Sequence, residues 1–145
     1  ATEPCYAAMV ITAINGTMLH SRTAAQPFAQ TCQQLEQACG RQGYGILASH
    51  NVGDTLRSKG FDTTDAVTVY EICHPGHAAA LLAADPALAA ALPCRIAVGT
   101  HQGATLVSLL SPLELLTALS PASEVRTTAE QVERDIQAIV EAAAA

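Results

Sequence analysis

The chain has 145 residues, which is enough for one domain to bury a substantial hydrophobic core without disulfide or metal support. Its formal net charge is −6 and its 7 basic residues are scattered, so the sequence lacks the basic stripe that binds nucleic-acid backbones. Half of the residues are apolar, yet no apolar run approaches the roughly 20 residues that span a bilayer. We therefore expect a single domain over residues 1–145, with no nucleic-acid partner and no membrane span.

The first predicted elements are a strand and an amphipathic helix. Residues 7–14 are mostly apolar with β-branched members, which predicts a strand. Over residues 24–39 apolar side chains recur at helical spacing, and Pro27 falls in the expected first turn. Cys32 and Cys39 lie on the apolar stripe of this helix, where packing in the core is their expected role.

Two strands and a helical hairpin are predicted in the middle of the chain. β-branched residues and alternating polarity indicate the strands, and a proline at each helical start indicates the helices. The expected ranges are strands over residues 44–52 and 66–73, and helices over residues 76–84 and 86–92. Cys73 therefore lies at the end of a strand and shortly before a helix.

The last part of the chain predicts a β-hairpin and two further helical segments. The strands are expected over residues 94–100 and 104–110, joined by a short turn that contains glycine. A helical turn over residues 113–119 and an amphipathic helix over residues 128–143 follow. This order of elements predicts an α+β fold, with a mostly antiparallel sheet and helices packed on one face.

Three short motifs in the middle of the chain carry a resemblance to a known family. They are Cys73-His74-Pro75-Gly76, then Asp85-Pro86, then Leu92-Pro93-Cys94. With further matching residues between about 10 and 112, the chain resembles domain-of-unknown-function family 302. The resemblance implies a fold like that of the TATA-binding protein, in the order strand, helix, four strands and helix. It also implies a small, often dimeric protein without an established activity.

The chain departs from the usual pattern of that family at three histidines. His74 stands where the resemblance implies an asparagine in a Cys-Asn-Pro motif, and His77 follows in the same segment. His50 is a further departure. These imidazoles bring possible metal ligands near the two cysteines that the chain shares with the family, so an ordinary family role does not carry over directly.

The candidate metal ligands are Cys73, His74, His77 and Cys94, and the first three are also the candidate cofactor-binding residues. If the strand that ends at Cys73 pairs with the one that begins at Cys94, both sulfurs lie at one edge of the sheet. Thiolate and imidazole together suit copper or zinc, and a haem is the metal-containing cofactor considered. Inert core thiols and a plain disulfide are the structural alternatives.

Three classes of function follow from these residues. The leading hypothesis is a protein that binds a metal ion or haem through the Cys/His cluster. The second is a thiol-based enzyme or sulfur carrier, in which Cys73 reacts and His77 acts as its base. The third is a structural or interaction domain without a ligand.

The amino terminus and the cysteine count bear on location and assembly. The chain begins Ala1-Thr-Glu-Pro-Cys5 without Met, as a mature chain does after signal-peptide cleavage, and its five cysteines are an odd number. We expect a periplasmic or secreted protein, with the cytoplasm as the alternative. Cys5 could pair with Cys32, with Cys39 or with another subunit. The Ala-rich, weakly charged surface and the resemblance predict a homodimer, which sedimentation at micromolar concentration tests.

Overall fold

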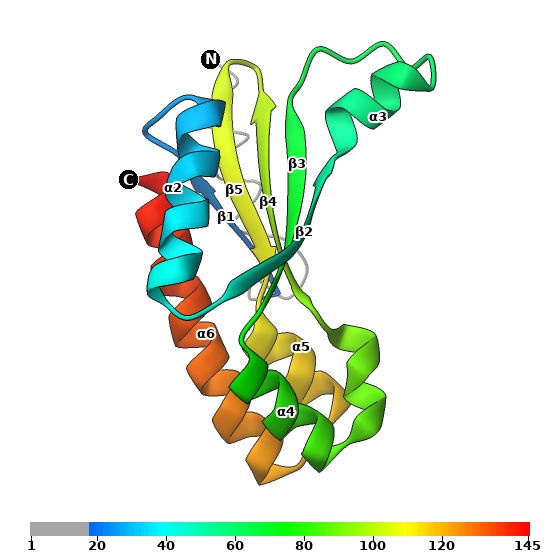
Figure 1. Ribbon diagram of the computed structural model, residues 1–145, viewed down its shortest axis with the longest axis vertical. Helices are drawn as coiled ribbons and strands as arrows, with labels where there is room; N and C mark the ends of the chain where they lie inside the picture. Colours follow the sequence, from blue (N-terminus) through cyan, green and yellow to red (C-terminus); the bar gives the residue numbers. More distant parts are fainter. Residues whose placement is uncertain (1–17) are drawn as a thin grey trace.

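Within residues 18–145, five antiparallel strands form one open sheet in the order β1-β5-β4-β3-β2 (Figure 1). The computed structural model describes residues 18–145, so the strand predicted over residues 7–14 and any pairing of Cys5 lie outside the described residues. The strands are β1 (Leu19–Thr23), β2 (Gly45–Asn51), β3 (Val67–Cys73), β4 (Cys94–His101) and β5 (Ala104–Leu110). The predicted antiparallel α+β fold is confirmed.

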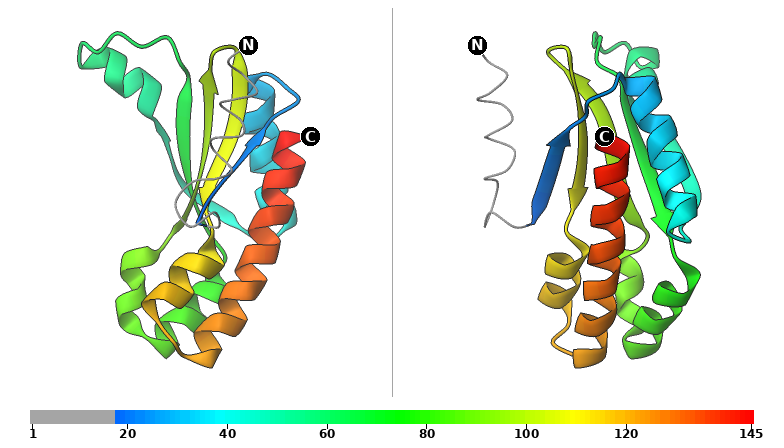
Figure 2. Two further views of the ribbon diagram at one scale, coloured as in Figure 1. Left: turned by 180° about the vertical axis from the view of Figure 1, so that it is seen from behind. Right: turned by 90° about the vertical axis from the view of Figure 1, so that its left-hand side faces the viewer.

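The helices divide between one face of the sheet and one of its ends. Helices α2 (Phe28–Arg41) and α6 (Ser123–Ala144) lie side by side on the same face (Figures 1 and 2). The short helices α4 (Pro75–Ala84), η2 (Pro86–Ala91) and α5 (Pro112–Leu119) gather beyond one end of the sheet, and α3 (Val52–Ser58) extends from β2. No helix within residues 18–145 is long and apolar enough to cross a membrane.

The chain order matches strand, helix, four strands and helix, but three details of the prediction were wrong. The first described strand is β1, in a segment for which the sequence predicts no element. Pro27 precedes α2 as its N-cap instead of lying in its first turn. Helix α6 begins at Ser123 rather than at residue 128, and Val125 in its added first turns is fully buried in the smaller core.

Two hydrophobic cores share α6. The larger core lies between the sheet and the helices α2 and α6, and it includes Ile72, Ile96 and the fully buried Cys39. The smaller core joins α4, η2 and α5 around Leu81 and Leu116. Because α6 contributes apolar side chains to both cores, its middle turns lie at the junction between them. The cysteine and histidine residues of the predicted site lie at this junction.

Three helices beyond the end of the sheet begin with the same N-capping motif. Each has a polar N-cap residue followed by a proline, at His74-Pro75, Asp85-Pro86 and Ser111-Pro112. The cap side chain accepts a backbone N–H of the first turn, and proline suits the next position because it lacks an N–H that would need a partner. The two turns between β3 and β4 are therefore set by local sequence, and they return the chain to the sheet next to the strand that it left.

Candidate functional site

The ends of two neighbouring strands bring the two shared cysteines together. In the antiparallel register of β3 and β4, Ile72 pairs with Cys94, so Cys73 is one residue beyond that pair. Cys73 and Cys94 line a single cavity of about 20 Å³, and His74, His77 and Tyr44 line it with them. This volume is close to what one water molecule occupies. The helical hairpin thus places all four predicted site residues around one small space.

The two thiols in this cavity are not bonded to each other. Cys73 and Cys94 are both free and half-buried. Burial raises the pKa of the Cys94 thiol to about 11, and the nearby Cys73 and Glu133 act in the same direction. Cys94 is therefore a neutral thiol at neutral pH when the cavity holds no positive charge. A cation placed between the sulfurs would favour the thiolate form of Cys94 that burial disfavours.

His74 has a structural task at the start of α4. Its Nδ1 accepts the backbone N–H of His77 at 3.3 Å, in the position that an asparagine oxygen takes in an N-cap. In the neutral ring this arrangement leaves the proton on Nε2, so neither nitrogen of His74 offers a free lone pair to a metal. The replacement of the usual asparagine by His74 is thus explained by capping, and His74 is the weakest of the four predicted ligands.

The surroundings of the His74 ring also hold it in place. The ring stacks on His77 with centroids 4.0 Å apart and meets the edge of Tyr44 at 5.4 Å. Gly76 and Gly43 lie against it, and a Cβ at Gly76 would come within 3.2 Å of the ring. Rotating His74 towards the cysteines would give up these contacts together with the cap.

A chain of polar contacts reaches the cavity from α6. His77 Nε2 lies 3.3 Å from Asp135 Oδ2, and the Tyr44 hydroxyl donates to the same oxygen at 2.9 Å. Burial and then the Asp135 carboxylate raise the pKa of Tyr44 above its ordinary range, so its hydroxyl stays a donor. A carboxylate facing Nε2 favours a proton on that nitrogen, which leaves Nδ1 of a neutral His77 with its lone pair.

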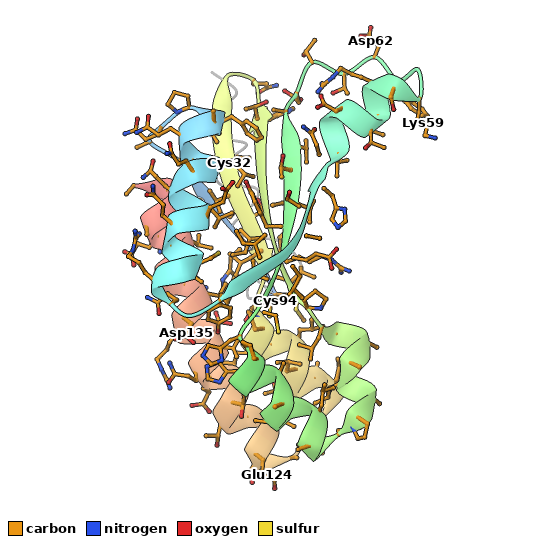
Figure 3. All side chains as sticks on the ribbon, viewed as in Figure 1. Cys32, Lys59, Asp62, Cys94, Glu124 and Asp135 are labelled. Carbon is orange, nitrogen blue, oxygen red and sulfur yellow. The ribbon has the colours of Figure 1, made fainter. Side chains whose placement is uncertain are left out.

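Tyr44 and Asp135 are the site residues that the sequence analysis missed. Figure 3 shows Asp135 on α6 and Cys94 at the start of β4, both where the sheet meets the lower helices. A signal for Asp135 was present, since it lies three residues after Val132 and four before Ile139 on the apolar stripe of α6. Because an acidic side chain is rarely buried unless it is paired, an Asp on such a stripe indicates a polar partner in the core. His50, by contrast, contacts Glu71 and does not line the cavity.

The arrangement sets limits on a metal site. Within residues 18–145 no three His, Cys, Asp or Glu side chains converge so that they could hold a metal ion. The side chains as they stand therefore offer two sulfurs rather than a closed tetrahedral set. Two adjacent thiols of this kind can hold an ion between them, or they can form and break a bond with each other.

Comparisons with known proteins agree with the fold. The family model described as Domain of unknown function DUF302 matches residues 20–143. A crystal structure of an uncharacterized conserved protein DUF302 from Bacillus stearothermophilus is similar to the chain with a TM-score of 0.81 and 22% identity. The match covers 87% of this chain and 98% of that one, and at this identity it shows the fold alone. No curated protein matches the chain.

Proposed function

The chain belongs to the DUF302 family, whose function is unknown. We propose that the protein binds a soft metal ion of low coordination number, Cu(I) in particular, between the sulfurs of Cys73 and Cys94. The observation that carries the proposal is the meeting of two unbonded cysteines from neighbouring strands at one cavity of about 20 Å³.

The donor set favours Cu(I) over the other metals considered. Thiolates are soft ligands that select Cu(I), Zn(II) and iron–sulfur clusters, and a structural zinc ion takes four ligands in a tetrahedron. Two sulfurs suit Cu(I), which accepts few ligands. Nδ1 of His77 is a further candidate ligand, because Nε2 faces Asp135, whereas His74 uses its Nδ1 to cap α4. The size of the cavity supports an ion rather than a haem, since sites for drug-sized ligands and cofactors measure about 300–1,000 Å³.

Anaerobic titration with Cu(I), against a competing chromogenic chelator, tests this proposal. We expect one tightly held Cu(I) per chain in a Cys5→Ser background, which removes the one cysteine outside the described residues. Replacing Cys94 or Cys73 with serine should weaken binding by more than about 100-fold, because losing a ligand costs more than the 10–100-fold typical of a supporting residue.

Two variants serve as matched controls for this titration. Cys32→Ser removes a half-buried thiol on α2 that does not line the cavity, and it should leave the affinity for Cu(I) unchanged. His74→Asn keeps an N-cap residue and should also keep the affinity. Equal loss of affinity in Cys32→Ser and Cys94→Ser would indicate binding by scattered thiols, and would contradict the proposal.

Assembly as a homodimer and export remain predictions. Ile46 and Leu47 on the edge strand β2 are exposed, as are Leu56 and Phe61 around α3, and Leu47 and Phe61 are each 63% exposed. Exposed apolar side chains of this kind support the predicted dimer. An interaction domain without a ligand would use such exposed side chains as well, and a chain that binds no metal yet sediments as a dimer would favour that alternative.

A further inference from the structure

We propose that Cys73 and Cys94 form an exchange-active dithiol whose substrates are low-molecular-weight disulfides. The activity uses the same two thiols as the proposed metal site but requires no metal, so each of the two proposals can fail alone. The geometry of the strand ends carries the proposal.

The two cysteines are placed for a bond between them. Because Cys73 is one residue out of register with Cys94, the spacing and rise of paired strands put their Cα atoms roughly 6 Å apart. Disulfides form across Cα separations of about 4.4–6.8 Å. Alternation along a regular strand would turn Cys73 and Cys94 to opposite faces, but Cys73 is the last residue of β3 and Cys94 is the first of β4, so both lie where the regular sheet ends. Both residues line the same cavity there.

The surroundings of the two sulfurs differ, and the difference sets the order of the steps. On the β2 side, Cys73 pairs with Gly45, which is exposed and carries no side chain that could block an incoming molecule. Cys94 lines the cavity of about 20 Å³ and also a second, largely apolar cavity of about 70 Å³ near Leu116. A disulfide from solvent therefore reaches Cys73 first, and Cys94 attacks from inside.

The exchange proceeds in two balanced steps. The Cys73 thiolate attacks one sulfur of a small disulfide RSSR, whose S–S bond breaks, and one RS⁻ leaves and takes up a proton as RSH. The Cys94 thiol then gives its proton to solvent and attacks Cys73 Sγ, which expels the second RS⁻ as RSH. The two cysteines lose two electrons, and RSSR gains them. Because the cavity is the size of a water molecule, only the reacting sulfur of the substrate enters it.

The test uses oxidised glutathione with the metal-free full-length protein, followed by peptide mapping under non-reducing conditions. The wild-type chain should yield a bond between the peptides that contain Cys73 and Cys94. Cys94→Ser should instead accumulate glutathione on Cys73. In Cys73→Ser, glutathione should reach Cys94 no faster than it reaches Cys32, the comparison thiol on α2.

Three results would overturn the proposal. They are a wild-type chain without the Cys73–Cys94 bond, a Cys94→Ser variant that carries no glutathione on Cys73, and rapid modification of Cys94 in Cys73→Ser. The wild-type mapping stands even if a variant fails to fold. A chain that reacts with oxidised glutathione but does not bind Cu(I) would refute the proposed function and support this inference. A chain that binds Cu(I) but does not react with oxidised glutathione would support the proposed function and refute this inference.

Discussion

Replacing Glu133 with alanine is expected to lower the free energy of unfolding by about 3 kcal/mol. The Glu133 carboxylate on α6 accepts the Ser111 hydroxyl at 2.7 Å and the Leu113 N–H at 3.1 Å with one oxygen, and the Gln137 amide at 3.0 Å with the other. It thereby ties the start of α5 to the middle of α6. Each donor left unsatisfied in a partly buried place costs about 1–3 kcal/mol.

The same carboxylate makes stability depend on pH. Burial acts to raise the pKa of Glu133, and the hydrogen bonds from Ser111, Gln137 and the Leu113 N–H outweigh it, so the pKa is lowered in the folded chain. A lowered folded pKa gives stability that is present above the unfolded value, about 4.3 for glutamate, and is lost as the pH falls through the folded value. The wild-type chain should therefore lose part of its stability below about pH 4.3.

Urea unfolding at pH 7 and at a series of acid pH values measures both effects. Glu141→Ala is the matched control on the same helix, because its contact with Arg22, at 3.9 Å and on exposed side chains, should contribute little. The stability of Glu133→Ala should fall less steeply on acidification than that of the wild type. Parallel pH curves for wild type and Glu133→Ala would refute this role of the carboxylate.

The second large effect is expected at Asp135. In Asp135→Asn the carboxylate that faces His77 Nε2 is replaced by a neutral amide, while an oxygen remains to accept the Tyr44 hydroxyl. Residues that orient a metal ligand typically change metal affinity by 10–100-fold when they are replaced, and we expect a loss of Cu(I) affinity in that range. The competition titration with a chromogenic chelator measures it.

Tyr44→Phe serves as the control for Asp135. It removes one hydrogen bond to the carboxylate but leaves the charge in front of His77, so its Cu(I) affinity should stay close to that of the wild type. If Asp135→Asn and Tyr44→Phe lost affinity equally, Asp135 would act through packing at the junction and not through His77.

Much of the fold was predictable because its local signals are strong and consistent. The β-branched run that ends at Cys73, the hairpin of β4 and β5, and the prolines at 75 and 86 each mark an element that the structure contains. β1 was not predicted because the strand is short and its sequence, Leu-His-Ser-Arg-Thr, is mostly polar. Pairing with β5 and the Ser21–Ser108 hydrogen bond stabilise it. Pairing with a strand that is distant in the sequence produces no recognisable pattern in the local sequence.

The candidate site was predictable only in part, for a similar reason. Cys73 and Cys94 could be placed together from topology, because a hairpin of two helices between neighbouring antiparallel strands returns to the same edge. His74 was predicted as a ligand although its place before Pro75 matches the capping positions Asp85 and Ser111. The contact of Asp135 with His77 spans two elements far apart in the sequence, and spacing alone does not reveal it.

The most direct test of the two-thiol site is X-ray absorption at the copper edge, measured on the wild-type chain loaded with one equivalent of Cu(I). The account predicts that sulfur dominates the first coordination shell, with two sulfur ligands and at most one nitrogen. In Cys94→Ser the sulfur contribution should fall by half. A first shell made only of nitrogen and oxygen, or a spectrum unchanged by Cys94→Ser, would contradict the assignment of the metal to Cys73 and Cys94.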